Sequence, residues 1–200
     1  DLILKEDLTV GVDTNDNAVF NGNVNIENTD LVIRGTDLDP MSVGRGGGAV
    51  STNTRVGVQA LAANTSGSQN TAFGYQALLT NNVGASNTAI GNRALRVAGI
   101  ASNNIAIGKD VMLVTLSGGK NVAIGNNAME SNQTGSANVC IGHYAGYDIL
   151  GDGNVLIGPA DNETSADATF RPPNISGDRQ LVIGSGGQAW ICLLYTSPSP

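Results

Sequence analysis

The chain has few aromatic and few charged side chains for its length. Aromatic residues make up 4% and charged residues 14% of the 200 positions. A globular core of this size usually packs around large side chains, whereas the apolar content here is mostly Ala, Val, Ile and Leu. This composition favours a thin, repetitive core over a thick one.

Several other classes of protein are disfavoured by what is scarce. The formal net charge of −7 argues against nucleic acid and anionic membranes as partners, because both require a basic face. The sequence has no run of 18 apolar residues and no metal-ligand spacing. Two cysteines, Cys140 and Cys192, are too few for a disulfide framework. We therefore expect no nucleic-acid partner, no membrane insertion, no metal and no cofactor.

What is abundant is glycine, with 27 residues, and asparagine, with 23. Both recur in one phrase, as in "NTAIG" from Asn87 and "NVAIG" from Asn121. The opening Asn returns every 17 residues from Asn53 to Asn138, then after 16 at Asn154, and "QLVIG" follows 26 residues later. A fixed period of this kind is the main evidence on the fold. The fifth position of the phrase is glycine in all eight copies, namely Gly57, Gly74, Gly91, Gly108, Gly125, Gly142, Gly158 and Gly184.

The phrase predicts a short strand with two different faces. Positions two and four share one face of an extended strand, and position three lies on the other. Position four is large, and we expect it to stack inside the coil as the repeat core: Val56, Phe73, Ile90, Ile107, Ile124, Ile141 and Ile157. Position three is usually Ala, so we expect an outward, flat alanine stripe. That stripe would allow close self-association around an axis, as a homotrimer, unless these alanines are merely exposed.

We therefore predict an all-β fold, a parallel β-solenoid (β-roll) with 17-residue coils, preceded by short strands or hairpins. Each coil has a strand, a glycine corner, a second apolar segment and an Asn/Gly turn. The second segment, as in "NRALRVAG", leaves a helix-containing repeat open as an alternative. A lone coil cannot fold, because fixing its backbone costs roughly 17–34 kcal/mol, whereas its few buried side chains return about 1.5–3 kcal/mol each.

The flanks divide the chain further. Residues 1–40 alternate apolar and polar residues as hairpins do, and 41–52 predict a Gly-rich linker. Residues 53–158 form the seven-coil array, and 159–191 a capping insertion with the degenerate last repeat. We interpret 192–200 as a non-native tail, because "LLYTSPSP" resembles a translated sequencing adapter, and we expect the natural protein to continue past 191.

The "NxAIGxxAL" phrase resembles the head repeats of trimeric autotransporter adhesins, which form left-handed β-rolls in trimers, although that family has a shorter period. With the flanks "EDLTVGVDTNDNAVFNGNVNI" and "RQLVIGSGGQAWI", the chain looks more like phage tail-fibre or other virion appendage proteins. The resemblance covers most of residues 5–191. It implies a trimeric surface fibre.

The sequence offers few residues in arrangements that catalysis or metal binding would need. The one histidine, His143, has no second His and no positioned Ser or Cys partner, and Asp148 with Asp152 lacks the converging oxygens of a calcium site. A threonine ladder at Thr54, Thr71 and Thr88 fails at Ile105 and Val122, which argues against ice binding. We predict no catalytic residue and no enzymatic activity.

The expected function is a structural and adhesive segment of a viral tail fibre, located on the virion and contacting other virion tail proteins. It would support recognition of a host cell-surface glycan or receptor. One alternative is the head of a bacterial trimeric adhesin at the cell surface, and another is a tailspike solenoid that binds or degrades polysaccharide. The candidate surface contacts follow each glycine corner: Tyr75, Asn92, Lys109, Asn126 and His143.

Overall fold

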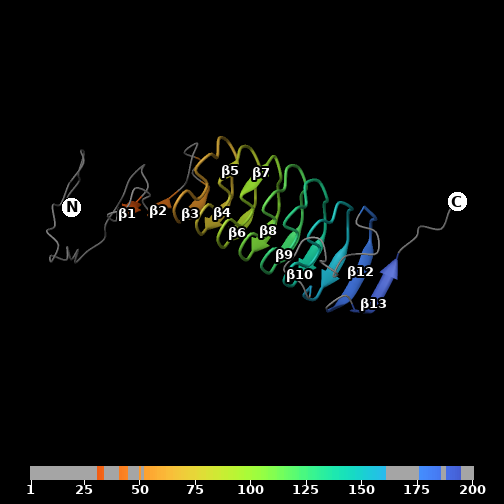
Figure 1. Ribbon diagram of the computed structural model, residues 1–200. Helices are drawn as coiled ribbons and strands as arrows, with labels where there is room; N and C mark the ends of the chain where they lie inside the picture. Colours follow the sequence, from red (N-terminus) through yellow and green to blue (C-terminus); the bar gives the residue numbers. More distant parts are fainter. Residues whose placement is uncertain are drawn as a thin grey trace, which may run out of the picture.

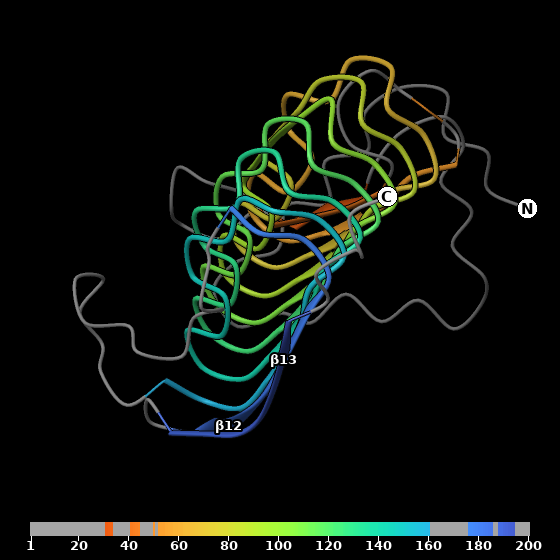
Figure 2. The ribbon, with the colours of Figure 1, turned by 90° about the vertical axis from the view of Figure 1, so that its right-hand side faces the viewer.

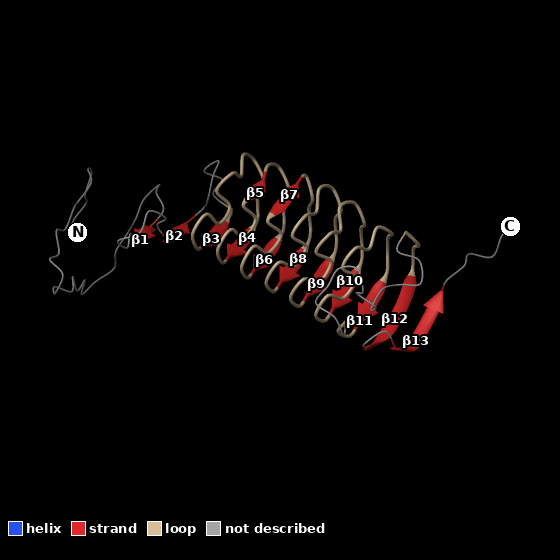
Figure 3. Ribbon diagram, viewed as in Figure 1, coloured by secondary structure: helices blue, strands red, loops and turns tan. Residues whose placement is uncertain are grey.

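The computed structural model describes residues 31–33, 41–44, 50, 52–160, 176–185 and 188–194, and in these ranges the fold is all-β with no helix (Figure 1, Figure 3). The predicted fold class is confirmed: the chain forms a parallel β-solenoid of about 6 turns with coils of about 17 residues. The strands are β1 (Leu31–Ile33), β2 (Met41–Gly44), β3 (Thr54–Val56), β4 (Thr71–Phe73), β5 (Thr80–Asn81), β6 (Thr88–Ile90), β7 (Val97–Gly99), β8 (Ile105–Ile107), β9 (Val122–Ile124), β10 (Val139–Ile141), β11 (Val155–Ile157), β12 (Gln180–Ser185) and β13 (Gln188–Leu194).

One long sheet runs along the solenoid in the order β1-β2-β3-β4-β6-β8-β9-β10-β11-β12-β13. From β3 to β12 each strand pairs in parallel with the next, at the equivalent residues of the phrase. Ala89, for example, pairs with Ala72 on one side and Ala106 on the other. On a further side of the coil, β5 and β7 form a two-stranded parallel sheet. Figure 2, a view turned by 90°, shows the coils as nested loops of similar outline.

The predicted orientation of the strands is wrong. The small residues at position three point inward and are 0–1% exposed at Ala72, Ala89, Ala106 and Ala123. The residues expected as the repeat core lie on the outer face instead, with Phe73 55% exposed. The other members of this outer row, Val56, Ile90, Ile107, Ile124, Ile141 and Ile157, are half-buried or exposed. The stripe that faces outward is therefore made of large side chains, not of alanine.

The interior is filled from the second apolar segment of each coil. Leu61, Leu78, Leu95, Met112 and Met129 are fully buried, and the residue before each, which is Val111 in one coil and Ala in the others, is buried with it. A coil of about 17 residues has room for one large side chain from this segment only if the facing strand contributes a small one. Alanine at position three is the small partner that this packing requires.

The coil that contains Cys140 shows that the volume of the interior side chains stays nearly constant from coil to coil. Its coil has the larger thiol in the alanine slot and Gly146 in the leucine slot, and a Cβ on Gly146 would lie 2.5 Å from Cys140 Sγ. In the next copy Leu156 fills the interior from the strand itself and is 0% exposed. A gain of volume on one wall is thus matched by a loss on the other.

The corner glycines between Gly57 and Gly158 all have φ between +129° and +139°. A side chain at this φ is strained, and the space is also closed: a Cβ on Gly91 would lie 2.3 Å from the carbonyl oxygen of Gly108 in the next coil. The expected corner role therefore holds for seven of the eight glycines. Gly184 differs, because it lies within β12 opposite Ala189.

Buried asparagines link consecutive coils. Asn87 Oδ1 accepts a hydrogen bond from the backbone N–H of Asn104 at 3.0 Å, and Asn87 Nδ2 donates to the carbonyl oxygen of Ala101 at 2.9 Å. The same pair of bonds recurs from Asn53 to Asn138. Gln180 occupies the asparagine slot of the last copy, where its N–H donates to Asn154 Oδ1 at 2.9 Å. The degenerate repeat is therefore in register, as β11 and β12 also show.

The helix alternative for the second segment is wrong within the described residues. Non-glycine residues of this segment alternate into the left-handed region, as at Arg93 with φ 55° and Leu95 with φ 48°. An α-helix needs consecutive right-handed residues. The segment instead runs as linked turns that send two consecutive side chains, such as Ala94 and Leu95, into the core.

The flanks end the parallel array with antiparallel strands. β2 pairs with β1 and β3, so residues 41–44 of the expected linker form a strand. β13 pairs antiparallel with β12 and includes Cys192, so the segment taken as a non-native tail begins inside a strand. Most of the expected hairpin region 1–40, the insertion at 161–175 and residues 195–200 lie outside the described residues.

Candidate interaction surface

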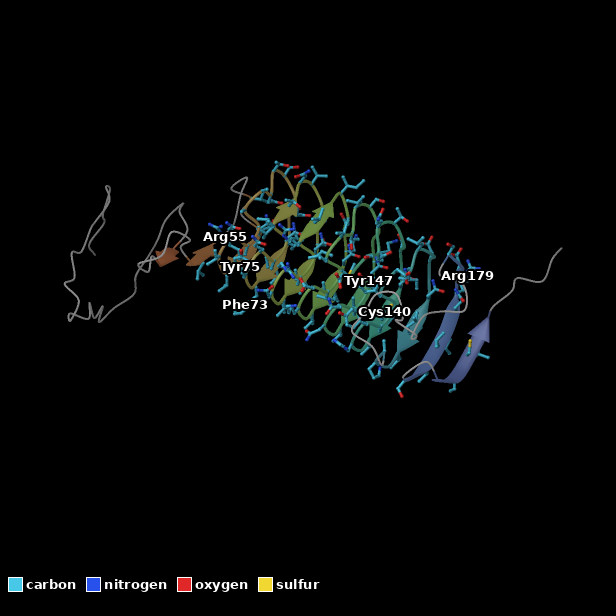
Figure 4. The ribbon with its side chains drawn as sticks, viewed as in Figure 1. Arg55, Phe73, Tyr75, Cys140, Tyr147 and Arg179 are labelled. Atoms are coloured by element: carbon cyan, nitrogen blue, oxygen red, sulfur yellow. The ribbon has the colours of Figure 1, made fainter. Side chains whose placement is uncertain are left out.

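The outer face of the long sheet has rows of exposed and half-buried apolar side chains. Its first row is the position-four row, which starts at Val56 and includes Phe73, labelled near the N-terminal end of the array in Figure 4. Its second row is position two, which is Thr at β3, β4 and β6 and then apolar at Ile105, Val122, Val139 and Val155. From β8 to β11 both rows are β-branched and neither has a charged residue.

The spacing of side chains on this face follows from the in-register pairing of the strands. Because the strands pair at equivalent residues, each row places one side chain per coil, about 4.8 Å from the next. Exposed apolar surface in a continuous patch is unfavourable in water and marks an interaction site. We define Ile105, Ile107, Ile124, Ile141 and Ile157, with the valines between them, as the apolar face.

The candidate contact residues that follow the glycine corners form a separate row. Tyr75, Asn92, Lys109 and Asn126 are exposed, and His143 is half-buried. Tyr75 is labelled in Figure 4 close to the N-terminal end of this row. Asn126 Oδ1 accepts a hydrogen bond from the backbone N–H of Lys109 at 2.9 Å, so part of the row also links coils. The structure places these residues on the surface, and their role in binding stays a prediction.

Beside that row lies an ionic cluster at one coil interface. Asp110 is buried, and its Oδ2 accepts a hydrogen bond from Arg93 Nη2 at 2.7 Å. Arg93 Nε lies 2.6 Å from Asp110 Oδ1 as an ion-pair contact. Lys109 Nζ lies 2.8 Å from Asp110 Oδ2. Burial tends to raise the pKa of the Asp110 carboxyl, but the hydrogen bonds from Arg93 and Lys109 outweigh burial and leave the pKa below its usual value. The cluster fixes the register between two coils.

The groups considered for chemistry are engaged in structure. His143 packs edge-on against Tyr144 with ring centroids 4.5 Å apart. Burial raises the pKa of the Cys140 thiol far above its usual value, so this thiol stays protonated in the core. Asp152 Oδ1 accepts a hydrogen bond from the backbone N–H of Ser136 at 2.6 Å. Among the described residues, no group of His, Cys, Asp and Glu could hold a metal ion.

No family model, no curated protein and no solved structure matches the chain. In the described part of the chain, no helix has the length and apolar character needed to cross a bilayer.

The apolar face was not predicted from the sequence, because the large side chains at position four were assigned to the interior. The signal was present elsewhere: every regular repeat already has one large apolar residue in the second segment, such as Leu78 or Met129, which is enough to fill a thin coil. The β-branched residues of the strands are therefore not needed to fill the core, and a regular row of exposed apolar residues is a candidate interaction surface.

Proposed function

We propose that the chain is a structural and adhesive segment of a viral tail fibre or related appendage, that it works as a homotrimer on the virion, and that it is not an enzyme. The apolar face is the observation that carries this proposal. It extends along the array from β8 to β11, and its exposed members include Ile105, Ile124 and Ile157. A face of this length needs a partner that covers it along these four coils.

A second copy of the chain fits this face better than an unrelated partner. The side chains recur once per coil at the strand spacing of about 4.8 Å, and only an array with the same spacing places one apolar side chain opposite each of them. Covering the face removes apolar area from water at about 25 cal/mol per Å². The face has no charge, so the net charge of −7 does not oppose contact there.

The two rows of the face support a ring over a face-to-face pair. Val122 and Ile124 lie side by side on the outer face of β9, so position two of one copy can pack against position four of the next. A head-to-tail contact of this kind closes into a cyclic oligomer around an axis. Three copies place all the strand faces toward that axis, and the corner row that includes Tyr75 and Asn92 remains outside for host contacts.

Rigidity is the second property that a fibre requires. Backbone hydrogen bonds and the asparagine ladder link each coil to the next, as between Asn104 and Asn121. Repetition of this link makes stability additive along the array. Such a segment suits a spacer that holds a recognition surface away from the particle and contacts other virion tail proteins at its ends.

Light scattering after size-exclusion chromatography tests the assembly. We expect the purified chain to have about three times the protomer mass of 20.4 kDa. Ile124→Glu places a charge in the apolar face and should give monomers with unchanged far-UV circular dichroism. The matched control, Thr134→Glu, changes an exposed residue outside the face and should remain trimeric. A monomeric wild-type chain, or a trimeric Ile124→Glu variant, refutes the proposed interface.

The location on a virion needs its own measurement. Antibodies raised against the array should label fibres of viral particles in negative-stain immunoelectron microscopy of material from the source sample. Label on bacterial envelopes, with unlabelled particles, would overturn this part of the proposal and favour a bacterial surface adhesin.

A further inference from the structure

A shallow groove crosses three coils at the corner that precedes the asparagine of each phrase. It has a volume of about 280 Å³ and is lined by Ile100, Ser102, Asn103, Ser117, Lys120 and Ser136, with Gly119 between them. This size suits a single sugar ring better than a peptide or a larger ligand. The groove lies outside the apolar face, so the trimer contact of the proposed function does not use its residues.

Gly119 opens the groove. The equivalent slot holds Ser102 in the coil before and Ser136 in the coil after, whereas Gly119 has no side chain there. The hydroxyl groups on both sides are held in place: Ser102 Oγ accepts a hydrogen bond from Ala85 N–H at 3.0 Å, and Ser136 Oγ accepts one from Gly119 N–H at 3.2 Å. A notch flanked by positioned hydroxyls is suited to polar ligands with several hydroxyl groups of their own.

The groove combines one cation with one apolar wall. Lys120 is exposed and brings a positive charge to the groove of an acidic chain. Ile100 is 63% exposed, which makes it the most exposed of the large hydrophobic residues in the described surface. Asp152 lies beyond Ser136, where it accepts the hydrogen bond from Ser136 N–H. An anionic group in the groove is therefore stabilised at the Lys120 end and repelled at the Asp152 end.

We propose that this groove binds a carboxylate-bearing saccharide, with the carboxylate at Lys120, the ring hydroxyls at Ser102 and Asn103, and the apolar C–H face of the ring against Ile100. Lysine and hydroxyl groups supply charge-assisted and neutral hydrogen bonds for such a ligand. The inference rests on the adhesive part of the proposed function, for which it names the class of ligand.

Two matched pairs of probes test the inference by isothermal titration calorimetry on the full chain. One pair is oligogalacturonate and its methyl ester, and the other is sialyllactose and lactose. In at least one pair the acidic sugar should bind about tenfold more tightly than its neutral partner, and the difference should shrink as salt rises. Equal affinity within both pairs, or no binding by either acidic sugar, overturns the inference.

The variants use residues that this chain already tolerates in the same slots. Lys120→Asn introduces the residue found at the equivalent Asn103, which has nearly the same left-handed φ, 62° against 61° at Lys120. This variant should lower the affinity for the acidic sugar to the affinity for its neutral partner. Ile100→Ser copies Ser117 and should weaken both sugars of a pair by a similar factor. Arg179→Asn, at the slot equivalent to Lys120 in the last repeat and outside the groove, removes one exposed positive charge and should leave both affinities unchanged.

The outcomes separate this inference from the proposed assembly. A trimer that does not discriminate acidic from neutral sugars overturns the groove and leaves the fibre intact. A monomer that binds the acidic sugar in a Lys120-dependent way overturns the trimer and leaves the groove intact. Lys120→Asn with unchanged affinity for the acidic sugar refutes the placement of the carboxylate.

Discussion

The corner glycine Gly91 should not tolerate even the methyl group of alanine. Its φ of +130° lies in a region that is essentially restricted to glycine, and an alanine there costs about 1–3 kcal/mol. The added Cβ would also lie 2.3 Å from the carbonyl oxygen of Gly108, which belongs to the backbone of the next coil and cannot rotate away. Strain and steric overlap therefore act together.

Relief of this overlap requires the two coils to separate at the corner. Two backbone hydrogen bonds lie beside it, from Gly108 N–H to Ile90 O and from Asp110 N–H to Asn92 O, both at 2.9 Å. Each contributes about 1 kcal/mol to stability. Together with the backbone strain, Gly91→Ala should lower the free energy of unfolding by about 3–5 kcal/mol, which is a large part of the stability of a typical domain.

Gly153→Ala is the matched control. Gly153 also has a positive φ, +68°, but the nearest atom to an added Cβ is Arg179 Cγ at 3.4 Å, and Ala137 occupies the equivalent slot with φ 57°. Left-handed strain of about 1–2 kcal/mol is partly offset by the reduced entropy of the unfolded chain, about 0.4–1 kcal/mol. The expected loss of stability is therefore about 0–1.6 kcal/mol.

Urea unfolding followed by circular dichroism compares the two variants, and hydrogen exchange locates the coil that opens. Gly91→Ala should unfold at clearly lower urea than Gly153→Ala, with exchange increased first in the coils on both sides of residue 91. The reasoning is refuted if both variants have the same midpoint, since the inter-coil overlap would then have no energetic consequence.

The remaining predictions concern the asparagine ladder, the core and the ionic cluster. Asn104→Ala leaves one buried backbone N–H and one carbonyl without partners and should cost about 2–6 kcal/mol in urea unfolding; a loss below 1 kcal/mol contradicts the ladder. Cys140→Ala and Gly146→Met should each destabilise the chain. The double variant should recover most of the lost stability, because it restores the Ala–Met pairing of the preceding coil. Additive losses in a double-mutant cycle contradict this packing. The stability that the ionised Asp110 contributes is fully present above the pKa of the unfolded chain, about 3.9. It is lost as the pH falls through the lower pKa of the folded chain. The difference in stability between wild type and Asp110→Asn should therefore disappear below about pH 4. A gap that is constant across this range in acid titrations of unfolding contradicts the role of the Arg93 ion pair.

Much of the solenoid could be predicted because its determinants are local and repeated. The glycine at the fifth position recurs because each corner needs a positive φ and lies close to the corner of the next coil. The same glycine is therefore found once in every coil of the array. The asparagine recurs because each one links two coils. Even the repeat that opens at Gln180 could be recognised from its "QLVIG" phrase, although its spacing is irregular.

The candidate site could be predicted only in part. The row after the corners is on the surface, as its variability indicated. The groove at Lys120 could not be predicted, because its residues come from three coils and its space exists only where Gly119 replaces a serine between two stacked neighbours. Its shape depends on the stacking of coils, which a single repeat does not contain.

The sequence by itself determined the period, the parallel in-register stacking and the corner residues, because these depend on backbone conformation and on contacts between identical positions. Only the tertiary structure decided which face of each strand lies inside. An alternating strand has two faces, and its pattern does not say which face is buried. The buried face is decided by the leucines and methionines that enter the interior from the opposite wall of the coil. These side chains leave space for Ala123 but not for Ile124.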